Sequence, residues 1–163
     1  MSRTPRPDPE RLAAWRALLV AFHTLRERLG RELEEERDLP LSWYEVMLVL
    51  NGAPDRRMRI TDLAHAVFLS KSGLSQLVSR MEAEGLVCRE AYAVDRRGVF
   101  ATLTDRGRRV FRRAAPVHLR GVQEHFGANL TPAEARMLQD ILAKVSPPPL
   151  DDVPAGDCGE SQL

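Results

Sequence analysis

Two short helices joined by almost no linker constrain the fold of this chain most strongly. TDLAHAVFL, which begins at Thr61, and SKSGLSQLVSRMEAE, which begins at Ser70, both space their apolar residues as a helix does, and only Leu69–Ser70 is interpreted as the link between them. Thr61 and Ser70 are suited to cap the two helices, and Gly85 is suited to end the second. Helices joined so tightly must cross at a steep angle, as in a helix-turn-helix.

Two β-favouring runs follow the second short helix. LVCREAY (86–92) and GVFATL (98–103) lie on either side of a polar Asp-Arg-Arg-Gly tip at 95–98, which predicts a β-hairpin. The earlier segment APDRRM (53–58) is interpreted as a loop. Together these elements predict a mainly α fold with a small β-hairpin wing, the winged helix-turn-helix.

Longer helices are predicted on both sides of this unit. The first, at 8–36, carries one long apolar stripe behind an Asp-Pro-Glu start. Thr104 is suited to cap a later helix, and Thr131 with Glu134 matches a capping box. Ser42 with Glu45 matches another capping box, at the start of a strongly apolar helix.

The predicted organisation is one domain with terminal helices. Residues 42–103 form the winged-helix part, and residues 8–36 and 104–145 supply the terminal helices, so the ordered domain is 8–145. Residues 1–7 are interpreted as a flexible N-terminus, and the acidic, proline-rich 146–163 as a disordered tail. No apolar run reaches the length of a membrane span and the first residues lack a secretory signal, so a cytoplasmic protein without membrane contact is expected.

Charge is unevenly distributed along the chain. Residues 56–113 hold 13 Lys and Arg against 6 Asp and Glu, although the whole chain has 24 against 23. A basic segment between acidic flanks is typical of nucleic-acid binding, with a solvated basic face as the alternative. The sequence contains no phosphate-binding glycine loop, nucleophile elbow or HExxH motif, so an enzyme is not expected.

The second short helix has two chemically different faces. Its apolar residues lie on one helical face and are Leu74, Leu77, Val78 and Met81. The other face carries short hydrogen-bonding side chains and two cations, which suit a DNA major groove, and an arginine at the wing tip suits the minor groove. The predicted DNA contacts are Thr61, Ser70, Lys71, Ser72, Ser75, Gln76, Ser79, Arg80, Arg96 and Arg97.

The segment LSKSGLSQLVSRMEAEGLVCREAYAVDRRGVFATLTDRGRRV (69–110) resembles the MarR family of bacterial transcription regulators, with Asp95, Arg97, Leu103 and Thr104 in the family's wing pattern. The resemblance implies a sequence-specific regulator that binds double-stranded DNA. It implies an obligate homodimer on a pseudo-palindromic operator, usually a repressor. It also implies a small aromatic or phenolic effector that weakens DNA binding, and no cofactor is expected.

The terminal helices offer more apolar surface than a small winged helix can cover, which independently predicts a dimer interface. The predicted interface residues are Leu12, Trp15, Leu19, Phe22, Val122, Phe126, Met137, Ile141 and Val145. A two-fold dimer would bring two recognition helices to successive major grooves.

The resemblance further implies an effector cavity built partly from the first two helices. The candidate effector-binding residues are Trp15, His23, Trp43, Tyr44, Met47 and His118. The alternative interpretation gives both tryptophans to the core or the dimer contact, because large aromatic side chains mostly serve burial.

Cys88, on the first wing strand, is expected to be a buried and inert thiol, since its one basic neighbour, Arg89, should face the other side of the strand. A redox-sensing regulator acting through Cys88 is an alternative function, and a winged helix that only docks proteins is another. His118 and His125 share one helical face, but two histidines two turns apart cannot chelate an ion alone, so no metal site is predicted.

Overall fold

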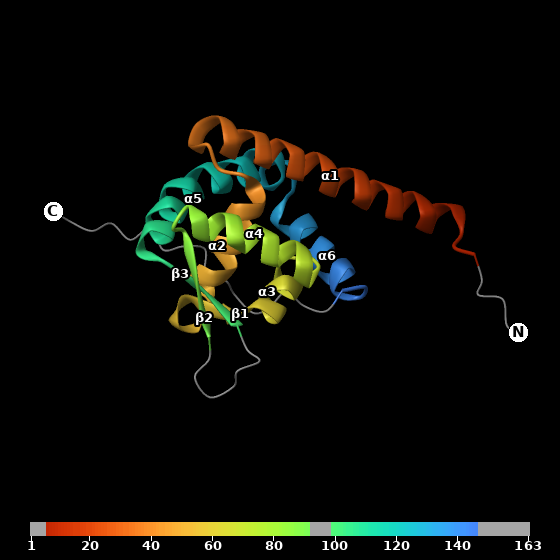
Figure 1. Ribbon diagram of the computed structural model, residues 1–163. Coiled ribbons are helices and arrows are strands. Elements are labelled where there is room, and N and C mark those ends of the chain that lie inside the picture. The colour runs from red at the N-terminus through yellow and green to blue at the C-terminus, as the bar shows by residue number, and fades with distance from the viewer. Residues whose placement is uncertain (1–5, 92–98, 147–163) are drawn as a thin grey trace, which may run out of the picture.

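The structure, a computed structural model, describes residues 6–91 and 99–146 (Figure 1). Its elements in chain order are α1 (Pro9–Arg37), α2 (Leu41–Gly52), the 3-10 helix η1 (Pro54–Arg56), β1 (Arg57–Arg59), α3 (Ile60–Ala66), α4 (Lys71–Ala83), β2 (Val87–Ala91), β3 (Val99–Leu103), α5 (Asp105–His125), the 3-10 helix η2 (Gly127–Asn129) and α6 (Pro132–Ala143). Across these residues, none of the helices has the length and apolar character needed to cross a membrane.

The strands form one antiparallel sheet in the order β1-β3-β2. The hairpin prediction is confirmed, since β2 pairs with β3 and Cys88 lies opposite Thr102. The interpretation of 53–58 as a loop was wrong at its end, because β1 begins at Arg57 and pairs with the other edge of β3. A strand this short owes its existence to that distant partner, so it leaves little local pattern to read.

The core lies between α2, α4, α5 and the sheet. The predicted apolar face of α4 is buried at every position, from Leu74 to Met81. On α2, Tyr44 and Met47 are buried, and Phe111 of α5 stacks on the Tyr44 ring with 5.4 Å between centroids. These contacts pack the apolar side of the helix-turn-helix against the core and leave the polar face of α4 exposed to solvent.

Most of the predicted helix caps are confirmed. The carboxylate of Asp8 accepts from the backbone N–H of Arg11 at 2.8 Å, and the Thr104 hydroxyl accepts from that of Gly107 at 3.0 Å. The Thr131 capping box is complete, with Glu134 returning the bond. Gly85 follows α4 with a φ of +66°, as its predicted terminal role requires.

Two predicted caps were wrong. Helix α2 begins one residue before Ser42, with Pro40 at the cap position, and the Glu45 carboxylate forms an ion pair with Arg26 of α1 instead of a capping box. Helix α3 begins before Thr61, whose hydroxyl donates to Asp62. The partner of Glu45 is an arginine on another helix, and a pairing between residues so far apart in the sequence leaves no local pattern.

The link between α3 and α4 is longer than predicted. It spans residues 67–70 rather than Leu69–Ser70 alone, and Phe68 within it has a φ of +55° and an exposed ring. The helix-turn-helix itself is confirmed, because Ser70 caps α4 by accepting from the Gly73 N–H at 3.1 Å.

The terminal helices meet through α1 and α5. The Arg37 side chain donates from Nε to the Arg113 carbonyl at 2.9 Å, and Arg120 forms an ion pair with Glu36. The N-terminal half of α1 extends past the rest of the molecule in Figure 1. Within the described part of the chain, α6 contains no buried residue.

Candidate nucleic-acid interface

The polar face of α4 is turned to solvent, as predicted. Most of the predicted contacts on described residues are exposed, namely Thr61, Ser70, Lys71, Ser72, Gln76, Ser79 and Arg80, whereas Ser75 is half-buried. The Ser70 cap fixes the start of the helix, and its hydroxyl lies 3.2 Å from that of Ser72. A helix N-terminus with a lysine at its first position suits a phosphate oxygen.

A cavity of about 290 Å³ lies where α3, α4 and the wing meet. Its lining includes the predicted contacts Thr61, Lys71 and Ser75, together with Arg59 and Arg89, which the sequence reasoning missed as site residues. Arg59 and Lys71 place two cationic side chains at this opening, which suits a polyanion, whereas the charge of Arg89 is paired with Glu82.

Arginines of β1 extend the basic surface. The guanidinium carbons of Arg57 and Arg59 lie 5.6 and 5.5 Å from the centre of the Phe100 ring, a distance at which cations and aromatic faces attract. The sequence signal for β1 was the alternation of Arg57, Met58 and Arg59. Three residues are too few to separate a strand from a loop.

Arg89 of β2 binds α4 instead of facing solvent freely. Its Nη1 donates to Glu82 Oε2 at 3.0 Å, and its Nη2 donates to the Ser75 carbonyl at 2.6 Å and to Ser79 Oγ at 2.8 Å. The Ser79 hydroxyl also donates to the Ser75 carbonyl at 3.0 Å. Because that hydroxyl has one proton, which the Ser75 carbonyl accepts, the Ser79 oxygen is left with acceptor capacity only.

The predicted wing-tip contacts Arg96 and Arg97 lie outside the described residues, as do Asp95 and Gly98. The strands on either side are described and pair as far as Ala91 and Val99. The two arginines therefore stay sequence-based predictions, attached to a confirmed hairpin.

Cys88 is half-buried rather than buried as expected. Its pKa is raised above the ordinary thiol value, first by desolvation and then by the negative charge of Glu90, whose carboxylate lies 3.8 Å from Sγ. A raised pKa lowers the thiolate fraction and with it the reactivity that a redox sensor needs. The surroundings of Cys88 thus disfavour the redox alternative.

The candidate effector residues do not line one cavity in the described chain. Tyr44 and Met47 belong to the core, and burial raises the pKa of Tyr44 to about 12. The His118 ring packs against that of Tyr44 in a tilted arrangement, with 4.4 Å between ring centroids. Trp43 is half-buried against the core, whereas Trp15 and His23 are exposed on α1.

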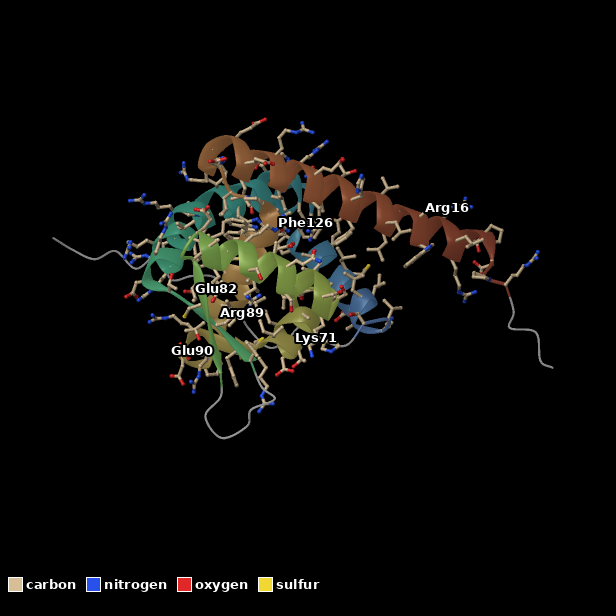
Figure 2. All side chains as sticks on the ribbon, in the orientation of Figure 1. Arg16, Lys71, Glu82, Arg89, Glu90 and Phe126 are labelled. Carbon is tan, nitrogen blue, oxygen red and sulfur yellow. The ribbon has the colours of Figure 1, made fainter. Side chains whose placement is uncertain are left out.

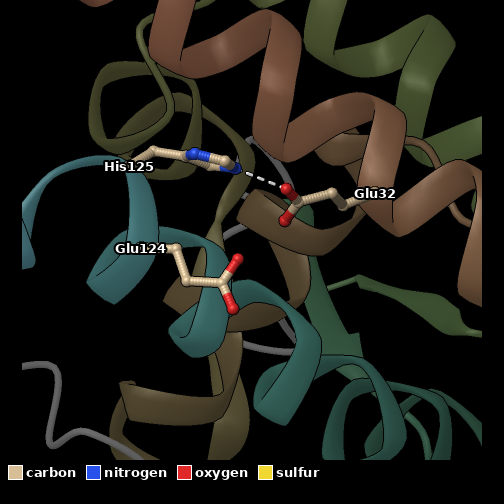
Figure 3. A group of neighbouring side chains, drawn as sticks. All are labelled: Glu32, Glu124 and His125. Carbon is tan, nitrogen blue, oxygen red and sulfur yellow. Dashed lines mark hydrogen bonds and ion pairs between the residues drawn. The ribbon is translucent and has the colours of Figure 1, made fainter.

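A group of possible metal ligands joins α1 to α5. Donor atoms of Glu32, Glu124 and His125 lie within 4.8 Å of one another (Figure 3). Glu32 forms an ion pair with His125, and Glu124 lies 3.9 Å from Nε of Arg120. Sequence reasoning missed this group because Glu32 is distant in the chain. Within the described residues these contacts satisfy the cluster only in part, because Glu32 Oε2 is buried without a hydrogen-bond partner.

The predicted dimer residues remain largely uncovered in the single chain. Those exposed are Leu12, Trp15, Leu19, Phe22, Phe126, Met137, Ile141 and Val145, whereas Val122 is half-buried. Side chains as large as Trp15, which is 56% exposed, are seldom left in water over a contiguous surface. Figure 2 labels Arg16 on the same projecting helix and Phe126 at the end of α5.

Fold and site together define a winged helix-turn-helix protein of the DNA-binding class. The profile of the MarR family matches residues 37–98. The transcriptional regulator HosA of Escherichia coli O127:H6 is 32% identical over 129 residues, which are 77% of this chain and 93% of HosA. The chain therefore belongs to the MarR family of DNA-binding transcriptional regulators, which confirms the resemblance and places it among regulators rather than enzymes.

Solved structures agree with this assignment. Sco3205 of Streptomyces coelicolor, a MarR family regulator solved in complex with DNA, is 36% identical with a TM-score of 0.81, covering 88% of this chain and 91% of that one. BpsR of Bordetella bronchiseptica, whose DNA binding is regulated by 6-hydroxynicotinic acid, shares the fold at 22% identity and a TM-score of 0.71, with coverage of 82% and 98%.

Proposed function

We propose that this protein is a homodimeric repressor that binds a pseudo-palindromic operator through α4 and the wing, and that a small aromatic acid releases it. The observation that carries the proposal is the exposed face of α4, where Lys71, Gln76 and Arg80 stand opposite a fully buried apolar face. Such a helix offers both phosphate and base contacts to a major groove.

The contacts divide into two roles. Lys71, at the start of α4, is proposed to contact a phosphate, and Gln76, five residues further along the helix, is proposed to read a base. Loss of a phosphate contact weakens binding to all sequences and lowers the salt slope by about 1. Loss of a bidentate base contact instead relaxes choice at one operator position by about 1–3 kcal/mol.

The test begins with selection of bound sequences from a random duplex pool, followed by titration at several salt concentrations. A palindromic enriched site with a steep negative salt slope supports the proposal. Lys71→Ala should then weaken binding uniformly, and Gln76→Ala should broaden the preference at one position. Binding without any enriched site, or equal losses on all sequences from both variants, would contradict it.

The effector part of the proposal is tested separately. BpsR responds to a hydroxylated aromatic acid, and the candidate effector contacts of this chain lie on α1, α2 and α5. Operator-bound protein is titrated with 6-hydroxynicotinic, salicylic and 4-hydroxybenzoic acids while DNA release is followed by fluorescence anisotropy. Saturable release by one acid supports the proposal; release by none of a wide panel of such acids counts against it.

A further inference from the structure

The wing and α4 are joined by one side chain with a dense set of bonds. Arg89 projects from β2, the wing strand next to α4, and meets Glu82 there (Figure 2). Besides its three guanidinium bonds, the backbone N–H of Arg89 donates to Glu82 Oε1 at 2.9 Å. Glu82 thus holds both the backbone and the side chain of Arg89, so neither can shift alone.

These bonds reach the face of α4 that borders the DNA contacts. The Ser75 carbonyl and Ser79 hydroxyl that Arg89 binds belong to residues next to Gln76 and Arg80 on the helix. Packing of the opposite, apolar face fixes the distance of α4 from the core. Rotation and sliding of the helix relative to the wing are restrained by directional hydrogen bonds, which an apolar contact does not supply.

Stability alone does not explain the pair. The side chains of Arg89 and Glu82 are 30% and 36% exposed, so water and salt screen their attraction. The three guanidinium bonds run to Glu82, Ser75 and Ser79 of α4 and hold the planar guanidinium group in one orientation. The pair therefore contributes more to orientation than to free energy of folding.

We propose that Arg89 and Glu82 are positioning residues for DNA recognition: they hold α4 and the wing in one fixed relation, and so set how strongly the protein prefers its operator over other DNA. The role rests on the operator binding proposed above. The two residues act through α4 and make no base contact of their own.

The sharpest test compares Glu82→Gln with Glu90→Gln. Glu90 lies next to Arg89 on β2 and is exposed. Each variant therefore removes one negative charge close to Arg89, from α4 in Glu82→Gln and from β2 in Glu90→Gln. Simple electrostatics predicts slightly tighter binding to all DNA from each. Positioning predicts that only Glu82→Gln lowers the ratio of operator to non-specific affinity, by about fivefold to tenfold, the size typical of altered coupling.

Arg89 itself needs a variant that separates positioning from a direct phosphate contact. Arg89→Gln should lower the same affinity ratio while leaving the salt slope of operator binding unchanged. A direct phosphate contact would instead lower the slope by about 1. Arg89→Lys keeps the charge but lacks the planar fork, so it should behave like Arg89→Gln rather than like the parent.

The pair should also act as a unit. The double variant Glu82→Gln/Arg89→Gln is expected to lower the ratio by less than the two single losses combined, because the contact between Arg89 and Glu82 is lost in common. Circular dichroism and thermal unfolding establish that every variant is folded. If Arg89→Gln fails to fold, the near-isosteric Glu82→Gln still decides the question.

The outcomes separate the two proposals. A parent that enriches no operator overturns the proposed function and this role with it. A parent that enriches an operator, with Glu82→Gln indistinguishable from Glu90→Gln, overturns this role alone. A salt slope reduced by about 1 in Arg89→Gln also overturns it, and makes Arg89 a phosphate contact.

Discussion

The half-buried ring of His118 shows how one residue responds to pH. His118 packs on Tyr44, and in the described part of the chain its Nδ1 is buried without a hydrogen-bond partner. Desolvation lowers the pKa of His118, and the charge of Glu32 opposes this only in part. The folded state therefore favours the neutral ring more than the unfolded chain does.

This difference in pKa predicts a loss of stability in acid. The unfolded histidine titrates near pH 6.5, so stability is fully present above that value and declines as pH falls toward the lower pKa of the folded state. The decline from this group is at most about 1.4 kcal/mol per pH unit. His118→Phe keeps a ring against Tyr44 and should lose less stability between pH 7.5 and 5.5, measured by urea unfolding at fixed protein concentration. An unchanged pH dependence would contradict the role of His118.

Cys88 should react slowly with alkylating reagents. In a Cys158→Ser background, the rate of iodoacetamide addition should rise with pH to a midpoint above the ordinary thiol pKa of 9.0, because burial and Glu90 disfavour the thiolate. Replacing Glu90 with Gln removes the nearby negative charge and should lower the pH midpoint of the reaction rate. A midpoint below 8 would refute this account and restore Cys88 as a candidate redox sensor.

At the scale of whole elements, the junction between the wing and α5 depends on one glycine, Gly107. A Cβ on Gly107 would lie 2.1 Å from the backbone oxygen of Leu86 and 2.7 Å from Leu103 Cδ1. Gly85 and Leu86 also supply the carbonyls that bind the Thr104 hydroxyl. The first turn of α5 can reach the base of the wing only without a side chain at 107.

Matched glycine substitutions test this junction. Gly107→Ala should destabilise the protein by about 1–3 kcal/mol, because backbone must move to admit the methyl group. Gly30→Ala makes the same change inside α1, where the nearest atom, Leu41 Cβ, is 3.7 Å away. It should stabilise by about 0.5–1 kcal/mol through helix propensity. Thermal unfolding measures the change in stability of each variant. If both variants were stabilised, or both destabilised, the argument would be refuted.

The elements also show what the sequence could predict. The apolar face of α4, the Ser70 and Thr104 caps and the hairpin follow from spacing and chemistry within a few residues, and all are confirmed. Strand β1 and the bond from Arg89 to Glu82 depend on partners that only folding brings close. For the same reason Glu45 was assigned to a cap, although its carboxylate binds Arg26 on another helix.

At the scale of the whole molecule, one chain leaves an apolar surface uncovered. Met137 and Ile141, on one face of α6, are 62% and 49% exposed, and Trp15 and Phe22 on α1 are exposed to a similar extent. A helix as short and as amphipathic as α6, which has 12 residues, is unstable without a packing partner. Proteins of the MarR family are generally dimeric, and a second copy of the chain would cover the exposed apolar residues of α1 and α6.

The dimer is expected to be necessary for operator binding. Ile141→Asp places a charge in the predicted interface, which is costly to bury, and should convert a particle of twice 18.4 kDa into a monomer in sedimentation experiments. Gln139→Asp adds the same charge on the polar side of α6 and should leave the dimer intact. Because a monomer carries only one recognition helix, Ile141→Asp should also lose operator affinity far more than non-specific affinity. A monomeric parent would refute the dimer, and an Ile141→Asp variant that stays dimeric would place the interface elsewhere.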